Sequence, residues 1–322
     1  MNELGGGIID WRNDGLVLSA EQKTFYFDNG YLVVRKCVPK SEIDRYNERF
    51  NYICNADPSE FPFLGVMRDI TLADTEKTVK KVTKIQFWQD DPVLFEYCKY
   101  PTIVDIVKDL IGIPQSNIVA MHTVLINKPP DTGKLSSRHP MHQDLQYFPF
   151  RPADLICAAW TAMQKINREN GCLSFVPGTH KGPLLPHVYP DWAVCRYPST
   201  TSRQVNNKAF HGIKDFDLSL PRVHVEMDEG DTLFFHPLIH HGSGVNRTDG
   251  FRRAISCHYA NDDLCHYSNE KNETQEEIDR DLMELFEKKT KRLGIKVDTS
   301  DLDYSYTFRI RSRPVNGTKS NL

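Results

Sequence analysis

The sequence is organised around one stretch, Met141-His142-Gln143-Asp144-Leu145-Gln146-Tyr147-Phe148. Its centre is a His-x-Asp pair, His142 and Asp144. Residues i and i+2 of a β-strand point to the same face, so a strand here would hold the imidazole and the carboxylate side by side. Placed in this way, the two groups can occupy adjacent positions on one metal ion.

A second histidine from elsewhere in the chain would complete a set of two histidines and one carboxylate. Bound to one face of a metal, this set is typical of non-haem Fe(II) oxygenases, because it leaves coordination positions open. The later segment 236–244 offers three candidates, His236, His240 and His241. His240 and His241 are neighbours, so on a strand only one of them can point inward. The pattern itself does not choose among the three.

An isolated His-x-Asp pair is weak evidence, because a chain with 12 histidines contains about one such pair by chance. A second segment of the same spacing, His224-Val225-Glu226, illustrates this. The buried face of that strand is expected to consist of Val223, Val225 and Met227. His224 and Glu226 are therefore expected to face water.

Composition narrows the class of protein. The 322 residues are 39% hydrophobic and 26% charged, and the net charge of −3 provides no basic field for nucleic acid. No apolar run approaches the ~20 residues of a membrane span. The first residues lack the basic and apolar regions of a secretory signal. Eight scattered cysteines without a Cys-x-x-Cys motif favour reduced, partly buried thiols.

The first third of the chain has the periodicity of helices. A capping box at Ser19 predicts a helix over 20–28 that ends at Asn29-Gly30, followed by a short strand over 31–34. Ser41 is predicted to cap a second helix, whose inner face is Ile43, Tyr46, Phe50 and Ile53. Residues 56–82 show no regular pattern. Two short helices are predicted within 92–111, the second beginning at Pro101.

From about residue 118 the pattern changes to that of short strands. Strands are predicted at 118–126, 155–163, 172–176, 223–227, 231–236 and 252–260, with a long excursion over 183–221. Thr274 is predicted to cap a helix to about residue 293, with Ile278, Leu282, Leu285 and Phe286 inward. Helices followed by many short strands predict a mainly β fold, with a sandwich or jelly-roll core and flanking α-helices.

No domain linker is evident, so residues 1–322 are predicted to form a single domain. Its helical N-terminal part spans about 17–112, its jelly-roll core about 113–262, and its C-terminal helix and tail 272–322. Within the core, Arg252 could bind a dicarboxylate cosubstrate, because a guanidinium grips a carboxylate through two parallel N–H donors. Its neighbour Arg253 is expected to be a solvated surface charge.

Taken together, the motifs resemble those of the phytanoyl-CoA dioxygenase family. The matching segments are Met141–Pro152, Asn170–Cys172, Pro177–Gly182, Gly230–Thr232, His236-Pro237, His241–Gly244 and Gly250–Arg252. The likeness runs from about residue 17 to the C-terminus. It implies a double-stranded β-helix that uses Fe(II), 2-oxoglutarate, O2 and ascorbate. The implied activity is 2-hydroxylation of a branched fatty acyl-CoA, such as phytanoyl-CoA, in peroxisomal α-oxidation.

The resemblance also implies roles for individual residues. The implied iron ligands are His142, Asp144 and His241. Arg252 and Ser243 match the residues that hold the far carboxylate of 2-oxoglutarate, and further cosubstrate contacts match Lys84, Trp160 and Val124. Without the resemblance, Lys84 would pass for a solvated lysine and Trp160 for a core residue.

Two features differ from the family pattern. The excursion around 193–207 is longer than expected, and no N-terminal peroxisomal address is evident. Targeting would then depend on the C-terminal Ser320-Asn321-Leu322, one residue away from the peroxisomal Ser-Lys-Leu signal that an import receptor reads.

Two other functions fit the same fold. A jelly-roll metalloenzyme that does not use 2-oxoglutarate would have no need of Arg252. A non-catalytic binding scaffold would have no need of His142, Asp144 and His241 together.

Overall fold

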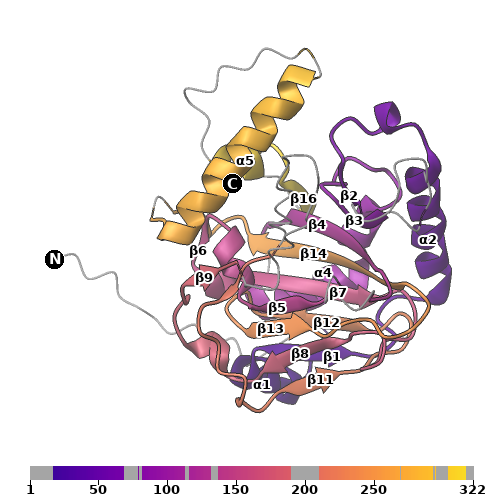
Figure 1. Cartoon of the computed structure of the whole chain (residues 1–322). Coiled ribbons are helices and arrows are strands. Elements are labelled where there is room, and N and C mark those ends of the chain that lie inside the picture. The colour runs from indigo at the N-terminus through magenta and orange to yellow at the C-terminus, as the bar shows by residue number, and fades with distance from the viewer. Residues whose placement is uncertain are drawn as a thin grey trace.

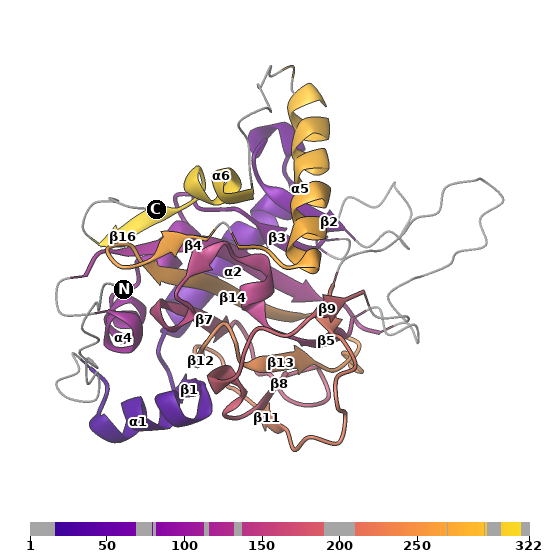
Figure 2. The same cartoon turned by 90° about the vertical axis from the view of Figure 1, so that its left-hand side faces the viewer.

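The computed structural model describes residues 17–68, 79, 82–112, 116–131, 137–189, 210–268, 270–292, 294 and 304–316. In these residues the two larger sheets are antiparallel and face each other, with helices outside the larger one (Figures 1 and 2). This is the mainly β, jelly-roll architecture with flanking helices that the sequence predicts. The excursion at 193–207 and the C-terminal tripeptide lie outside the described residues.

The N-terminal helices form largely as predicted. Helix α1 spans Ala20–Asn29, with the predicted capping box between Ser19 and Gln22 and a left-handed glycine at its end. Helix α2 spans Lys40–Asn55 and buries the predicted face. Its start was predicted wrongly: the carbonyl of Pro39 accepts the first helical hydrogen bonds, so Ser41 lies inside the helix. Helices α3 (Phe95–Cys98) and α4 (Pro101–Ile111) follow, and α4 begins at the predicted proline.

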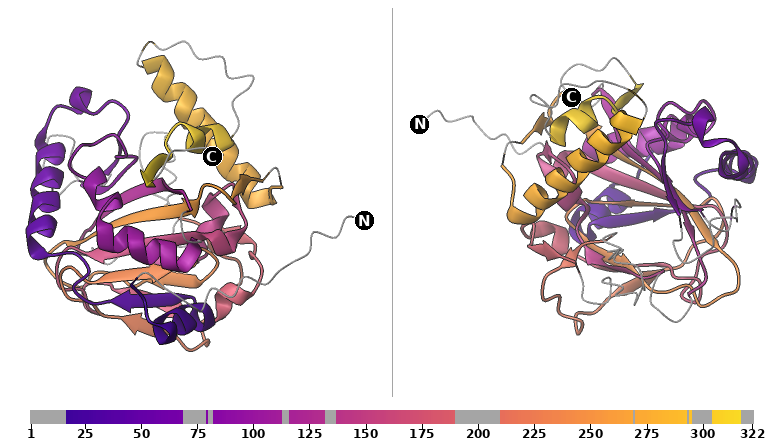
Figure 3. Two further views of the ribbon diagram at one scale, coloured as in Figure 1. Left: turned by 180° about the vertical axis from the view of Figure 1, so that it is seen from behind. Right: turned by 45° about the horizontal axis from the view of Figure 1, so that its top comes forward.

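The large sheet has the strand order β1-β12-β7-β14-β4-β3-β2, and β16 also pairs with β4. Its strands are β1 (Tyr31–Val34), β2 (Gly65–Arg68), β3 (Val82–Gln86), β4 (Ile118–Lys128), β7 (Ile156–Ala162), β12 (Thr232–Phe235), β14 (Arg252–Asn261) and β16 (Arg313–Asn316). Strands β2, β3 and β16 were not predicted. They are short, partly exposed strands toward the edge of the sheet, so their sequences lack an apolar alternation. Seen from behind, α4 lies across this sheet (Figure 3).

Alternation along β14 assigns its two arginines to opposite layers. Arg252 points between the sheets and is 2% exposed. Arg253 points toward α2, where its guanidinium lies 5.0 Å from the Phe50 ring centroid and donates hydrogen bonds to Asn47 and Asn127. The prediction that Arg253 is a solvated surface charge was therefore wrong, because helix α2 covers that face of the sheet. The seven described cysteines are free and buried, as expected of reduced thiols.

The small sheet has the order β11-β8-β13-β5. Its strands are β5 (His139–His142), β8 (Leu173–Val176), β11 (Val223–Val225) and β13 (His240–Ser243). Shorter elements are the pairs β9 (His187–Val188) with β10 (Gly212–Ile213) and β6 (Phe150–Arg151) with β15 (His266–Tyr267), and the 3-10 turns η1 (Pro58–Glu60), η2 (Asp144–Tyr147), η3 (Ala153–Leu155) and η4 (Thr179–Lys181). His224 and Glu226 are exposed as predicted. Val223, predicted to be buried, is exposed because β11 lies at the sheet edge.

Two helices lie toward the C-terminus, α5 (Glu273–Arg292) and α6 (Tyr304–Arg309). Asn272 rather than Thr274 caps α5, since the Asn272 and Gln275 side chains each accept a hydrogen bond from the other's backbone N–H. The Thr274 hydroxyl instead donates to the His187 carbonyl. Ile278 is buried as predicted, whereas the side chains of Leu282, Leu285 and Phe286 are outside the described set. Among the described helices, none combines the length and apolar character needed to cross a bilayer.

Candidate metal centre

The His-x-Asp pair lies where β5 ends. His142 is the last residue of β5, and Asp144 begins the 3-10 turn η2 rather than continuing a strand as predicted. Both side chains still point to one side, because Gln143 between them keeps an extended backbone (φ −120°, ψ 126°). The Gln143 amide donates to the carbonyls of Pro183 and Leu238, which fixes this turn.

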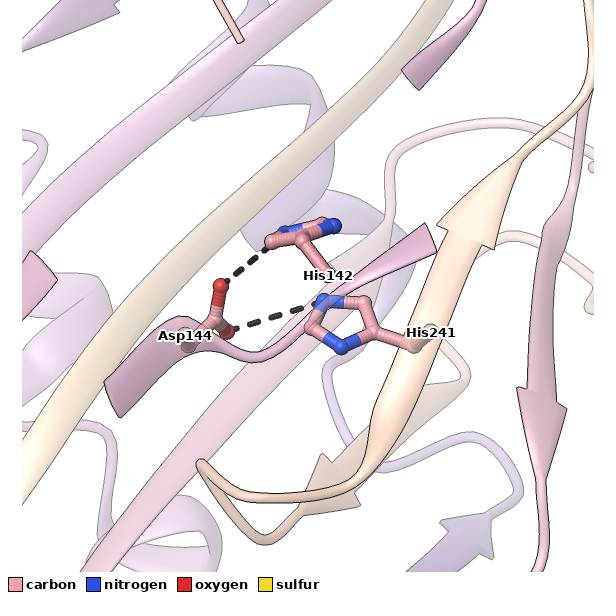
Figure 4. A group of neighbouring side chains, drawn as sticks. All are labelled: His142, Asp144 and His241. Carbon is pink, nitrogen blue, oxygen red and sulfur yellow. Dashed lines mark ion pairs between the residues drawn. The ribbon is translucent and has the colours of Figure 1, made fainter. Parts of the chain in front are cut away.

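The sheet pairing brings His241 to the same place. His241 on β13 pairs directly with His142 on β5, and the two ring centroids are 4.2 Å apart. His142 Nε2 lies 3.2 Å from Asp144 Oδ1, and His241 Nε2 lies 3.7 Å from Asp144 Oδ2 (Figure 4). The three donor atoms lie within 4.8 Å of one another, and all three residues are buried. Two imidazoles and one carboxylate at this spacing can hold a metal ion.

Backbone hydrogen bonds turn the correct ring nitrogens toward the centre. Nδ1 of His142 is 2.9 Å from the Pro140 carbonyl oxygen, and Nδ1 of His241 is 3.1 Å from that of Ile239. A carbonyl oxygen only accepts, so each Nδ1 is the donor, and Nε2 is the ring nitrogen left available to bind a metal ion. Such partners orient metal-binding histidines in known sites.

The charges at this centre also suit a cation. Burial alone would raise the pKa of Asp144, but His241, His258 and His142 outweigh it and hold that pKa well below its usual value. Burial lowers the pKa of His241 to about 3, so its ring is neutral at physiological pH. Asp144 is thus a buried carboxylate beside the neutral ring of His241, and a bound metal ion would neutralise its charge.

The other two candidate histidines point elsewhere. Nε2 of His236 lies 3.0 Å from Asp154 Oδ1, and its Nδ1 accepts a hydrogen bond from the Leu238 backbone. Both of its ring nitrogens are thus occupied. His240 faces away from His142, as the strand alternation requires, and packs near Phe216. Of the three candidates, only His241 lies beside Asp144.

A buried cation lies at another point of the same interior. Arg252 rests on the face of Trp160, with 5.3 Å between its guanidinium carbon and the ring centroid. Nη2 donates to the Gly171 carbonyl at 3.1 Å, but Nε and Nη1 are buried without a partner among the described residues. Burial lowers the pKa of Arg252 to about 10, so it stays charged at neutral pH. A buried guanidinium with unused N–H donors fits an anionic ligand.

The remaining predicted residues line this interior on β3 and β4. Lys84 pairs with Ile126, so it shares a face with Val124 two residues earlier on β4. Its Nζ lies 5.6 Å from the Phe210 ring centroid. Burial lowers the pKa of Lys84 to about 8, against the opposing pull of Asp144. Val124 itself is buried.

Two residues in the site were missed by the sequence analysis. His258 Nε2 lies 2.8 Å from Asp144 Oδ2, and Lys128 Nζ lies 2.7 Å from Ser243 Oγ. Alternation from Arg252 places His258 on the inner face of β14, so strand parity could have found it. Lys128 could not be found in this way, because its position opposite Arg252 depends on the pairing of β4 with β14.

Comparisons with known proteins agree with this architecture. Residues 26–254 match the family Phytanoyl-CoA dioxygenase (PhyH). A Caenorhabditis elegans protein named probable phytanoyl-CoA dioxygenase is 58% identical over 321 residues, 99% of this chain and 100% of that protein. The human peroxisomal phytanoyl-CoA dioxygenase is 47% identical over 311 residues, 96% of this chain and 86% of that protein.

Solved structures share the fold. EvdO2 from Micromonospora carbonacea complexed with 2-oxoglutarate superposes with a TM-score of 0.57 at 16% identity, covering 80% of this chain and 96% of that chain. The epimerase SnoN in complex with Fe3+, alpha ketoglutarate and nogalamycin RO gives 0.56 at 20% identity, covering 77% and 85%. At such identities the likeness concerns the fold. The family match and the relatives along nearly the whole chain go further: this chain is an enzyme of the phytanoyl-CoA dioxygenase family.

Proposed function

We propose that this enzyme is an Fe(II)- and 2-oxoglutarate-dependent 2-hydroxylase of a branched fatty acyl-CoA, such as phytanoyl-CoA. One observation carries the cosubstrate part of the proposal. The buried guanidinium of Arg252, with two unused donor nitrogens, lies in the same sheet interior as the His142, Asp144 and His241 cluster. The substrate class comes from the relatives, whose names specify phytanoyl-CoA.

In this proposal His142, Asp144 and His241 would hold Fe(II). The donor set fits, because Nε2 of the two histidines and a carboxylate oxygen of Asp144 lie within 4.8 Å of one another, and a set of two histidines and one carboxylate leaves coordination positions open. When bound, the iron supplies the oxygen chemistry that no side chain can perform. The chain itself contributes the ligand geometry, and buried surroundings keep water from the reacting groups.

The cosubstrate would be held at its two ends by different groups. Its far carboxylate would not contact the metal, so in a buried site this carboxylate requires a cationic partner. Arg252 would supply that partner, with Ser243 donating a further hydrogen bond. Trp160 supports the guanidinium from its flat face, while Lys84 and Val124 line the neighbouring wall. Their common role is to orient the cosubstrate, which is a positioning effect.

Two further parts of the proposal concern the cellular setting. Ascorbate would keep the bound iron in its ferrous state. The enzyme would act in peroxisomal α-oxidation, in keeping with the rat and human relatives named as peroxisomal. Ser320-Asn321-Leu322 would be the segment that the import receptor binds. A fluorescent protein that carries the last dozen residues should then collect in peroxisomes, and diffuse signal would contradict this assignment.

Mass spectrometry of acyl-CoAs tests the activity directly. Straight and branched acyl-CoAs are incubated with enzyme, Fe(II), 2-oxoglutarate, ascorbate and O2. We expect a product with one added oxygen at C2, together with an equal amount of succinate. Product without succinate would favour a metalloenzyme that does not use 2-oxoglutarate. No product from any acyl-CoA, with tight acyl-CoA binding, would favour a non-catalytic scaffold.

A further inference from the structure

We propose that Lys128 is a second cation for the far carboxylate of the cosubstrate, and that it also directs the Ser243 hydroxyl toward that carboxylate. Lys128 would thereby set the preference of the site for a dicarboxylate. The inference rests on the proposed function, because it concerns the same 2-oxoglutarate site. It assigns Lys128 a positioning role and not a chemical step.

The position of Lys128 follows from the pairing of two neighbouring strands. Lys128 is the last residue of β4 and Arg252 the first of β14, and the two residues are direct partners in the sheet. Both are buried, at 5% and 2% exposure. Two cationic side chains therefore lie next to each other at one end of the interior, although burying even one is costly.

The hydrogen bonds of Lys128 determine what Ser243 can do. Lys128 Nζ lies 2.7 Å from Ser243 Oγ and also donates to the carbonyl oxygen of Gly244. An ammonium group has donors only, so the Ser243 oxygen must be the acceptor. The hydrogen of the Ser243 hydroxyl has no acceptor among the described residues. It is left free to donate to a ligand, and a carboxylate accepts such a bond.

The positive charges of this pair have no ion-pair partner among the described residues. No ion pair joins Lys128 or Arg252 to a carboxylate in the part of the chain that the structure describes. Burial, followed by the charge of Arg252, lowers the pKa of Lys128 well below its usual value, and Asp131 opposes this. Burial raises the pKa of the nearby Cys172 thiol, which keeps it neutral. A bound carboxylate would supply the missing negative charge.

The Lys128 ammonium packs closely against the turn at Gly171. Gly171 has φ +81°, and a Cβ there would lie 3.0 Å from Lys128 Nζ and 2.8 Å from the Gly244 oxygen. The Gly171 carbonyl in turn accepts from Arg252. The turn at Gly171, the end of β13 and the two cations thus form one tightly packed cluster. Fixed donors of this kind bind an anion without first paying for their own ordering.

A structural role for Lys128 makes a different prediction. If Lys128 only ties the end of β13 to β4, its loss should disturb every ligand of the site equally. If it acts on the far carboxylate, its loss should weaken only those ligands that have one. 2-Oxopentanoate provides the comparison, because it has the same chain length as 2-oxoglutarate with a methyl group in place of that carboxylate.

The experiment is calorimetric titration of the Mn(II)-loaded protein, in which turnover does not occur, with each of the two acids. For Lys128→Met we expect about a tenfold or greater loss of 2-oxoglutarate affinity, as for removal of one charged partner in a buried pair. Affinities for 2-oxopentanoate and for Mn(II) alone should stay at the wild-type values. The matched control is Lys165→Met, the same substitution at an exposed lysine, and it should change neither acid.

Two results would overturn the inference: unchanged 2-oxoglutarate affinity in Lys128→Met, or an equal loss for both acids. A wild-type protein that binds neither acid would overturn the proposed function as well, so the two failures are distinguishable. Lys128→Gln is the second variant in case the methionine variant does not fold. Its amide can still donate to Ser243 but has no charge, and it too should lose affinity for 2-oxoglutarate alone.

Discussion

His258 is hydrogen-bonded to the Asp144 carboxylate. Its Nε2 faces the carboxylate oxygen Oδ2 at 2.8 Å, so it is the hydrogen-bond donor. Without this bond the carboxylate could rotate away from His142 and His241, the two histidines proposed to bind the metal. We expect His258→Phe to weaken Fe(II) affinity about 10- to 100-fold, the usual effect of removing a partner of a metal ligand. Anaerobic Fe(II) titration measures this.

A neighbouring histidine provides the control for that change. The ring of His122 is 5.9 Å from the ring of His258 and packs against Phe148, yet no hydrogen bond joins it to Asp144. His122→Phe makes the same imidazole-to-phenyl substitution beside His258. Equal Fe(II) affinity in the two variants would mean that His258 does not orient the carboxylate.

Lys84 should make the free energy of unfolding depend on pH in the alkaline range. Its pKa is lowered from 10.5 to about 8, so between these values the unfolded chain binds more protons than the folded one. Stability therefore rises with pH across this window, and below pH 8 the buried ammonium costs its full penalty. In the metal-free protein, the free energy of unfolding of Lys84→Met should be higher than that of wild type at pH 7. The difference should be smaller at pH 10. Denaturant unfolding at both values measures this; a constant difference would contradict it.

Only some residues of the site could be predicted from the sequence. The His142 and Asp144 pair can be recognised in the sequence because the two residues are only two positions apart. His241 needed the resemblance, since three histidines close in sequence fit equally well. Lys128 meets Ser243 over 115 positions of sequence separation, and only the sheet pairing brings them together. Contacts between residues so far apart in the chain leave no pattern in the local sequence.

At the scale of elements, the alternating side chains of β14 place Arg252 between the sheets and Arg253 beneath α2. Arg252→Ala should lower 2-oxoglutarate affinity on the order of a hundredfold or more, since it leaves a buried carboxylate unpaired. Arg252→Lys should raise the KM for 2-oxoglutarate but keep some turnover, because it retains charge and loses the paired donors. Iron affinity should barely change. Titration of succinate release with 2-oxoglutarate measures these effects.

Arg253 is the internal control on the same strand. It bonds Asn47 and Asn127 in the layer beneath α2, so Arg253→Ala should lower the free energy of unfolding by about 1–3 kcal/mol. Its 2-oxoglutarate affinity should equal that of wild type. If Arg253→Ala impairs cosubstrate binding and Arg252→Ala does not, the orientation of this strand is wrong.

Elements with strong internal patterns were predictable, and elements without them were not. The predicted strand at 252–260 differs from β14 by one residue, because its apolar alternation is long. β13 was missed as a strand, since His-His-Gly-Ser has no apolar pattern and pairs only because β5 and β8 lie on either side. The caps of α2 and α5 were each placed two residues too late, at Ser41 instead of Pro39 and at Thr274 instead of Asn272.

At the scale of the whole molecule, both sheets are needed to make one site. His142, Asp144 and His241 come from the small sheet and its adjoining turn, whereas Arg252, Trp160, Lys84 and Val124 come from the large sheet. In the proposed function, a metal on one wall and a cation on the other would hold the two charged ends of the cosubstrate. The two walls would then act in one reaction, with Asp144 as the anionic metal ligand.

The most direct test uses 18O2 with an acyl-CoA substrate, Fe(II) and 2-oxoglutarate, on wild type and Asp144→Ala. For wild type we predict one 18O atom in the 2-hydroxyacyl-CoA and one in succinate, in equal amounts. Asp144→Ala should remain folded by circular dichroism, bind little Fe(II) and form neither labelled product. Labelled 2-hydroxyacyl-CoA from Asp144→Ala at the wild-type rate would contradict the account.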